Sequence, residues 1–379
     1  MKLADTKDIR ALNRLIILQT IHKQTPLSRA DIAGITKLNK ATVSTIVKEL
    51  IDLNLIAETS IGDSTGGRKP IMLTPLHCNG YAIALDINIT HINIIITYLN
   101  SMIISKHQLP LEGIDFSHNF NLLCAFLRKL ITSLAPTSFG VVGIGVAVRG
   151  IVDLQHMIRY IHILNWIDID LKSLLESEFN IPVYIDNEGN FSAMAESLHY
   201  PHIKDLAVLT IDDVVSAGIL SNSQLVRGFR GYANSLAHHI IDFDGRSCIC
   251  GQKGCLEAYI SHRALLKEVN HTMPVVDIDT FIALAQSNHP VATEILEHFI
   301  IYLAAGLTNL IYILDCELII INSKIITAIP QLLDAVQERI ILPITKSQTM
   351  CSSKIGELAP LLGAAKLVCD NFYKNIVMF

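Results

Sequence analysis

The first 75 residues place apolar side chains at the 3.6-residue period of amphipathic helices. The clearest helical face, with spacings i, i+3, i+4, i+7 and i+8, consists of Val43, Ile46, Val47, Leu50 and Ile51. Asn39 stands before this face as an N-cap, and Lys40 opens the first turn. The pattern therefore predicts a helix that begins near residue 40.

Two more helices are predicted upstream. Ser28 and Asp31 have the spacing of a capping box, with Asp in the place of Glu or Gln, and they open a short helix. Residues 6–22 also have helical spacing, through the apolar positions Ile9, Leu12, Leu15 and Ile16. A tight turn at residues 36–39 joins the last two helices, and this order predicts a helix-turn-helix.

A basic hairpin is expected to follow these helices. Strand-like runs at residues 55–59 and 71–74 enclose a glycine-rich basic segment, residues 62–70, which predicts a wing. Residues 1–76 are thus predicted to be a winged helix-turn-helix domain that binds DNA. Its contacts with phosphates and base edges are expected from Asn39, Lys40, Thr42, Ser44, Thr45, Lys48, Arg68 and Lys69. The alternative is a small helical module for protein interaction with an ordinary solvated face.

From residue 80 the pattern changes to the strand period. Strand-like runs occupy residues 81–87, 91–99, 102–107 and 141–148, with a helical stretch at 120–134. A second series of strands begins at residues 206–211 and 218–220, and more helices follow. Strands mixed with helices, twice over, predict an α/β body of two lobes with a ligand cleft between them.

One apolar segment, residues 299–321, is long enough to test for a membrane span. Asn309, Asp315 and Glu317 interrupt it, so we predict a buried helix, a turn and a buried strand instead. The N-terminal sequence MKLADTKDIR has no apolar signal core. We expect a cytoplasmic protein with no membrane span.

Composition and charge refine this picture. Half of the 379 residues are apolar and 17% are charged, which excludes a disordered chain. The net charge of −5 argues against a protein that coats nucleic acid over its whole surface. Residues 1–75 hold 11 Lys and Arg against 7 Asp and Glu, whereas the remainder holds 19 against 28. This asymmetry favours a small nucleic-acid-binding module fused to an acidic body.

Three of the eight cysteines, Cys248, Cys250 and Cys255, lie within eight residues. This spacing is too tight for independent disulfides, but thiolates so placed can converge on one tetrahedral ion. His238 completes a Cys₃His structural zinc site with no open position for catalysis, although the adjacent His239 is an equal candidate. The alternative is a group of buried free cysteines.

Several segments together resemble the ROK family of bacterial repressors and sugar kinases. They are LDINIT, GIGVAV, IDNEGN and a His before CICGQKGCLEAY, all following the predicted DNA-binding module. The resemblance implies an actin-like, sugar-kinase (RNase H-like) fold for residues 77–379. The N-terminal module is similar to the DNA-binding domains of the repressors in this family.

The resemblance also implies that ATP chemistry has been lost. Asn88 replaces the glycine of the first phosphate loop. The second phosphate loop contains Asp212 and Asp213, and Gly218 is the one family glycine that it keeps. Asn322 and Ser323 replace a third nucleotide-contacting glycine pair. Carboxylates repel polyphosphate, so we expect no ATP binding and no enzymatic activity.

The sugar-contacting positions of the family are better kept. The resemblance assigns effector binding to Gly150, Asn187, Glu188, His238 and Glu257, with Glu188 at the position of the kinase base. Ser235 replaces a family glutamate. Arg149 replaces a usual proline and adds positive charge, which would suit a phosphorylated or acidic sugar.

The sequence therefore predicts a transcriptional regulator, a repressor of carbohydrate-uptake or catabolism genes. It is expected to bind double-stranded operator DNA as a homodimer or tetramer, under the control of a sugar or sugar phosphate. One alternative is an ATP-dependent ROK sugar kinase. Another is a regulator with a vestigial sugar pocket, controlled by a protein partner.

Overall fold

The computed structural model describes residues 6–61, 70–233, 235–275, 277–341 and 349–378. Its N-terminal part, which we call the head, contains three helices: α1 (Thr6–Lys23), α2 (Arg29–Thr36) and α3 (Lys40–Asp52). Three short strands form one sheet in the order β1-β3-β2, with bounds β1 (Leu27–Ser28), β2 (Ile56–Ile61) and β3 (Ile71–Pro75). The predicted tip of the hairpin, with Arg68 and Lys69, lies outside the described residues.

Local capping sets the limits of the helices in the head. The Ser28 hydroxyl accepts from the amide of Asp31, whose carboxylate accepts in return from the Ser28 amide, so the predicted capping box is confirmed. Asn39 caps α3 by accepting from the amide of Thr42 at 2.8 Å, as predicted. The buried face of α3 is also the predicted one and consists of Val43, Ile46, Val47 and Leu50.

Three of the four apolar positions predicted for α1 do not face the core, whereas Leu15 packs against the apolar cluster of the head; the bounds of the helix are close to those expected. Ile9, Leu12 and Ile16 are 49%, 53% and 36% exposed. The side chains that α1 buries are instead Ala11, Ile17, Leu18 and Ile21. This helix carries two apolar stripes. Only the second faces the other head helices and the C-terminal helix, and periodicity within α1 cannot show where those partners lie.

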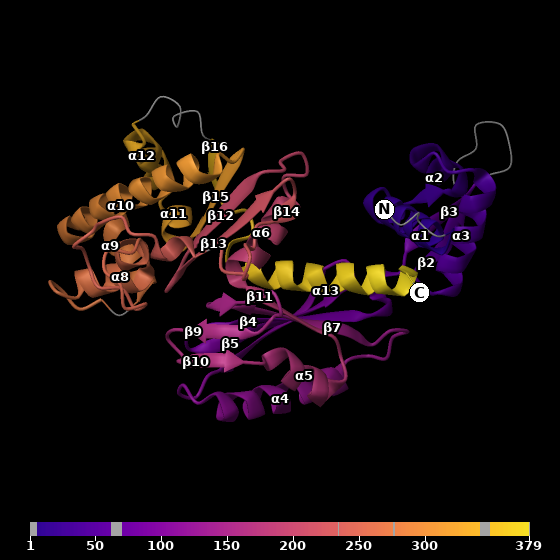
Figure 1. Ribbon diagram of the computed structural model, residues 1–379, viewed down its shortest axis with the longest axis horizontal. Coiled ribbons are helices and arrows are strands. Elements are labelled where there is room, and N and C mark those ends of the chain that lie inside the picture. Colours follow the sequence, from indigo (N-terminus) through magenta and orange to yellow (C-terminus); the bar gives the residue numbers. More distant parts are fainter. Residues whose placement is uncertain (1–5, 62–69, 234, 276, 342–348, 379) are drawn as a thin grey trace.

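The body consists of two lobes, each built on a five-stranded sheet (Figure 1). The first sheet has the order β11-β7-β4-β5-β6, in which β11, β7 and β4 are parallel and β4, β5 and β6 antiparallel. Its strands are β4 (Tyr81–Ile87), β5 (His91–Tyr98), β6 (Ile103–Pro110), β7 (Val141–Val148) and β11 (Val183–Asn187). Helices α4 (Phe116–Ser133) and α5 (Leu171–Phe179) pack on one face. A small antiparallel sheet is formed by β8 (Ile151–Val152), β9 (Ile158–Ile161) and β10 (Trp166–Ile169).

The second lobe repeats this plan with the order β14-β13-β12-β15-β16. Its strands are β12 (Leu206–Ile211), β13 (Val215–Ser221), β14 (Gln224–Leu225), β15 (Leu318–Ser323) and β16 (Thr349–Ser352). Its helices are α7 (Glu257–Ile260), α8 (His262–Val269), α9 (Ile278–Gln286), α10 (Pro290–Leu314), α11 (Lys324–Ala328) and α12 (Gln331–Arg339). Short 3₁₀ turns lie at η1 (His77–Asn79), η2 (Leu236–His238) and η3 (Gly356–Leu358). The predicted doubling of the α/β pattern is confirmed.

Helix α10 is long and apolar enough to cross a membrane by length and composition. However, 56% of its most apolar stretch is buried within the protein, which is typical of a core helix. Asp315 ends the helix in a left-handed conformation and β15 begins three residues later. The predicted sequence of buried helix, turn and buried strand is therefore confirmed.

Two helices lie between the sheets. In α6 (Glu188–Ser197), Phe191 packs against the first sheet and Ala193 against the second. Beside it lies α13 (Ala359–Met378), where Gly363 approaches the Phe191 carbonyl so closely that a Cβ would collide with it. Helix α13 then continues from the centre of the body to the head (Figure 1).

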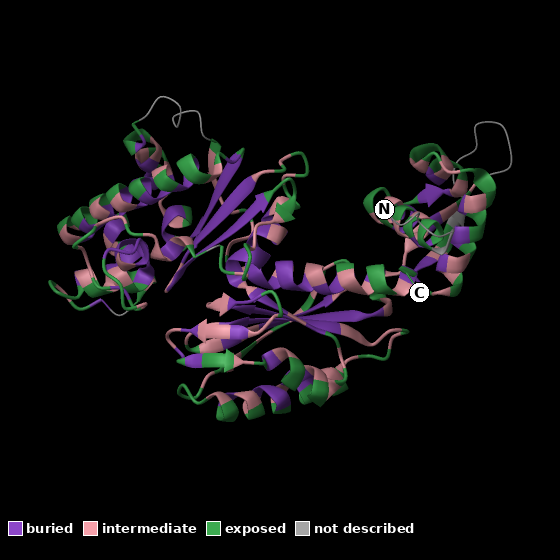
Figure 2. Ribbon diagram, viewed as in Figure 1, coloured by how far each residue is buried: buried purple, intermediate pink, exposed green. Residues whose placement is uncertain are grey.

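The head and the end of α13 share one apolar cluster. Cys369, Tyr373 and Val377 of α13 pack with the core residues of α1 and α3. The half of α13 that lies in the body is also largely buried (Figure 2). Arg14 of α1 donates to the carbonyl of Val377 at 3.1 Å. The ring of His22 lies 4.6 Å from that of Tyr373, and burial lowers the pKa of His22 to about 4. The head is thus packed against a helix that begins between the lobes.

Candidate effector cleft and metal cluster

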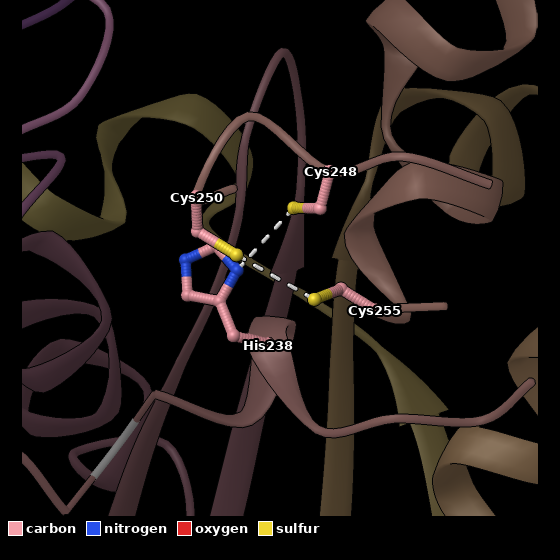
Figure 3. A group of neighbouring side chains, drawn as sticks. All are labelled: His238, Cys248, Cys250 and Cys255. Atoms are coloured by element: carbon pink, nitrogen blue, oxygen red, sulfur yellow. Dashed lines mark hydrogen bonds between the residues drawn. The ribbon is translucent and has the colours of Figure 1, made fainter. Parts of the chain in front are cut away.

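His238, Cys248, Cys250 and Cys255 converge on one point (Figure 3). One ligand atom of each lies within 4.8 Å of the others. Cys248 Sγ is 3.6 Å from His238 Nδ1, and Cys250 Sγ is 3.6 Å from Cys255 Sγ. His239 is not a member of the group, and its Nδ1 is paired with the Leu236 carbonyl. The structure therefore selects His238 from the two histidines that the sequence left open.

The loop between η2 and α7 is shaped to bring these side chains together. The amide of Cys248 donates to the Gln252 carbonyl, and that of Ile241 to the Gly254 carbonyl, both at 2.8 Å. Gly254 has φ +74°, and a Cβ there would collide with the carbonyl oxygen of Asp242. The turn thus requires glycine at this position.

The donor set fits a tetrahedral zinc ion. Cys248 and Cys255 are buried, and burial raises the pKa of the Cys248 thiol to about 11. Buried thiols of this kind stay protonated on their own, and a bound cation displaces their protons. Three thiolates and one imidazole leave no open position, as in a structural site.

A cleft of about 710 Å³ adjoins the Cys₃His group and shares His238 with it. Four of the five predicted effector residues line it: Gly150, Asn187, His238 and Glu257. Polar side chains that the sequence did not indicate line the same cleft: His162, Asn190, Ser216 and Tyr232. These four residues belong to different segments of the chain, and no local sequence motif identifies them as lining residues of the cleft.

Glu257 and Asn187 are held in place by backbone contacts. Glu257 is buried and its Oε2 accepts from the amide of Val215 at 3.1 Å. Burial raises the pKa of Glu257, and this hydrogen bond partly opposes the shift. Asn187 caps α6 through the Gly189 amide and donates Nδ2 to the Gly150 carbonyl at 2.8 Å. Carboxylate, amide and imidazole groups of this kind are hydrogen-bond partners for sugar hydroxyls.

Glu188 lies apart from the other four. It is fully buried, accepts a hydrogen bond from Ser216, and lines a second cleft of about 770 Å³. Burial raises its pKa, although the positive charge of Arg149 lowers it in part. The position of the kinase base therefore carries a carboxylate enclosed by protein groups.

Arg149 neutralises this region instead of presenting charge to a ligand. Its side chain is only 8% exposed, and its guanidinium lies 3.5 Å from Asp86, 3.8 Å from Glu188 and 3.1 Å from Asp212. Burial alone would lower the pKa of Arg149, but these carboxylates raise it. Arg149 also lines the first cleft, as expected of a residue near the predicted sugar pocket, but its charge is paired with carboxylates from both lobes, which argues against a phosphorylated or acidic sugar.

The second cleft contains the positions at which phosphate-loop glycines were expected. It is lined by Asn88, Asp212, Asp213 and Asn322. Gly218 does not line it, and a Cβ at Gly218 would collide with the carbonyl oxygen of Gly189 in α6. Gly218 is therefore required for the close packing of β13 against α6.

The predicted DNA-contacting side chains of α3 form one face. Lys40, Ser44, Thr45 and Lys48 are exposed, and Thr42 is half-buried. Asn39 is exposed as well, but its Oδ1 is used to cap the helix. These side chains point away from the buried stripe and are available to a partner.

A family model, described as the ROK family, matches residues 82–371. The chain belongs to the ROK family. Among curated relatives, the xylose repressor of Bacillus spizizenii is 33% identical over 384 residues, and the alignment covers 100% of both chains. A second ROK relative, the N-acetylglucosamine repressor of Escherichia coli O157:H7, is 25% identical over 93% of this chain and 92% of its own.

Solved ROK structures show the same fold. One is a ROK family transcriptional regulator, described as a homolog of E. coli MLC protein. Its alignment covers 97% of this chain and 98% of that protein, with a TM-score of 0.84 and 22% sequence identity. A ROK family glucokinase from Streptomyces griseus, solved with glucose and AMPPNP, covers 76% of this chain and 99% of its own, with a TM-score of 0.68 and 22% identity. The two-lobed body therefore has the actin-like fold of ROK proteins.

Proposed function

We propose that this ROK protein is a sugar-responsive transcriptional repressor. Residues 1–76 form its winged helix-turn-helix DNA-binding domain, and residues 77–379 sense the sugar. The observation that carries the proposal is the full-length match to the xylose repressor, which includes the head. The alignment with the glucokinase covers 99% of the glucokinase but only 76% of this chain. A sugar kinase alone would therefore not account for the presence of the head.

The head supplies the DNA contacts. Helix α3 enters the major groove and presents Lys40, Ser44, Thr45 and Lys48, with Thr42 beside them. Arg68 and Lys69, which lie between β2 and β3 in the sequence, would supply further positive charge for contacts with the adjacent DNA backbone. Two heads are needed to contact two half-sites, so the active form is a homodimer or tetramer in the cytoplasm.

The effector is an uncharged sugar, and the names of the relatives point to xylose. Asn187, His238 and Glu257 supply donors and acceptors for its hydroxyls. Among the described residues that line this cleft, the one cation, Arg149, is already paired with carboxylates. A sugar phosphate would therefore meet no free positive charge there.

The signal passes through α6 and α13. Asn187 caps α6, α6 packs along α13, and α13 ends in the apolar cluster of the head. A sugar that favours one arrangement of the lobes therefore shifts the positions of the two heads. His238 and the three cysteines would hold a zinc ion, which would stabilise the conformation of the loop beside the sugar.

ATP-dependent phosphorylation is not part of this function. Arg149 and the carboxylates of Asp86 and Asp212 line the cleft where a kinase needs glycine backbone and free positive charge. Incubation with radiolabelled ATP and xylose or glucose should give no sugar phosphate. Stoichiometric transfer of label to either sugar would contradict this part of the proposal.

The repressor function is tested by selecting bound duplexes from a random-sequence DNA library and measuring their affinity by fluorescence anisotropy. D-xylose should weaken binding about tenfold or more, whereas glucose 6-phosphate should have no effect. Glu257→Gln should retain DNA binding and lose the xylose response. The matched control Glu294→Gln, on the exposed side of α10, should keep both. Failure to enrich any DNA sequence would refute the function, and release by a protein but by no sugar would refute the choice of effector.

A further inference from the structure

The second cleft carries more negative than positive charge. Five carboxylates line it: Asp86, Glu188, Asp212, Asp213 and Glu357. The cations among its described lining residues are Arg149 and Lys324, and Lys324 is also bound to Asp279 at 2.7 Å. Such a surplus in a partly enclosed cleft is stabilised by a bound cation or by protonation.

Three of these side chains are arranged as ligands. One ligand atom each of Asp212, Asp213 and His262 lies within 4.8 Å of the other two. The aspartates form the tight turn between β12 and β13, in which the Asp212 amide donates to the Val214 carbonyl. His262 opens α8, and its amide donates to the Asp212 carbonyl at 2.8 Å. The cluster is therefore held by these backbone contacts and by two side-chain contacts of Asp212, with His262 Nδ1 at 3.2 Å and with Arg149 at 3.1 Å.

Several residues that line the same cleft have buried polar atoms without hydrogen-bond partners. Within the described part of the chain, no hydrogen-bond donor reaches Asp86 Oδ1 or Glu188 Oε2, and no hydrogen-bond partner reaches His262 Nε2; Arg149 Nε and Nη1 and Thr210 Oγ1 are likewise without one. Asp86 is 1% exposed and His262 4% exposed. Buried polar atoms are nearly always paired with protein, water or an ion, so these atoms indicate a polar occupant of the cleft.

We propose that Asp212, Asp213 and His262 bind a divalent transition-metal cation, separate from the Cys₃His site. Two carboxylates and an imidazole suit Mn²⁺ or Zn²⁺, whereas Mg²⁺ and Ca²⁺ prefer all-oxygen sites. The thiolates of the Cys₃His cluster select a softer ion, so the two sites differ in chemistry. A bound cation would neutralise the surplus charge and link the β12–β13 turn to α8.

Mn²⁺ provides a direct probe, because its free-ion paramagnetic resonance signal disappears on binding. The full-length protein, purified with its zinc retained, should bind one Mn²⁺ per chain in a saturable titration. Asp213→Asn should weaken that binding about tenfold or more. Asp213 is half-buried, and the substitution keeps its shape, so the variant should melt at the wild-type temperature. His262→Gln should weaken Mn²⁺ binding as well.

Asp334→Asn, on the exposed surface of α12, is the matched control and should bind Mn²⁺ like the wild type. Absence of saturable Mn²⁺ binding up to about 1 mM, beyond the range of most protein cation sites, would overturn the proposal. Undiminished binding by Asp213→Asn would overturn it too. Displacement of Mn²⁺ by equimolar Mg²⁺ would exclude His262 as a ligand and overturn the site as described. None of these outcomes depends on DNA or sugar binding, so the repressor function stands or falls separately.

Discussion

Arg149 offers the sharpest test of the electrostatics between the lobes. Arg149→Met keeps most of the side-chain volume but leaves Asp86 and Glu188, both buried, without their cation. Removing one member of a buried ion-pair network typically costs about 3–5 kcal/mol of stability. We therefore expect the midpoint of thermal unfolding, measured by calorimetry, to fall by roughly 6–20 °C at pH 8.

The loss should depend on pH with a definite sign. The pKa of Glu188 is already raised by burial, and the positive charge of Arg149 is what opposes that shift. Without Arg149 the folded pKa rises further above the unfolded value. A carboxyl group whose pKa is higher in the folded than in the unfolded protein adds to the free energy of unfolding at pH values below its unfolded pKa. This stabilisation is lost as the pH rises through the folded pKa. The destabilisation by Arg149→Met should therefore be smaller at pH 5 than at pH 8.

A surface ion pair provides the control. Arg128 is exposed and pairs with Glu178, so Arg128→Met should cost less than about 1 kcal/mol at either pH. Equal unfolding midpoints for Arg149→Met and Arg128→Met at pH 8 would refute the view that Arg149 holds buried carboxylates together. A destabilisation of Arg149→Met that grows as pH falls would refute the sign.

Three further outcomes are expected. Purified protein should contain at least one zinc ion per chain by atomic emission. Cys250→Ser should contain one zinc ion fewer per chain than the wild type and melt at a lower temperature, and an undiminished zinc content in that variant would contradict the ligand set. Ser28→Ala removes the capping box of α2 and should cost about 1 kcal/mol in thermal unfolding, whereas Ser287→Ala, beyond the end of α9, should cost less. Lys48→Ala should lower the slope of log affinity against log salt by about 1 if Lys48 contacts a phosphate, and an unchanged slope would remove it from the interface.

Features with short-range causes were predictable from the sequence. The capping box at Ser28 and the N-cap at Asn39 depend on atoms within three residues, and the structure has both. The close spacing of Cys248, Cys250 and Cys255 confined them to one loop, so their convergence needed little else. Strand positions such as β4 and β7 followed from continuous apolar runs that only a buried sheet can accommodate.

Features that depend on distant partners were not predictable. The apolar stripe of Ile9, Leu12 and Ile16 is as periodic as the buried stripe of α1, and only the positions of α2, α3 and α13 decide which stripe is buried. His162, between β9 and β10, lies far from the other residues of the first cleft in the sequence, and only the fold brings it to that cleft.

By itself, the sequence determined which segments form helices and strands, which cysteines can share an ion, and which family the chain resembles. Only the tertiary structure decided that His238 and not His239 faces those thiols. It also decided that the charge of Arg149 is used between the lobes and that Glu188 lies in the second cleft. Periodicity and capping act over a few residues, whereas the environment of a charge is set by groups that the fold brings together from far along the chain.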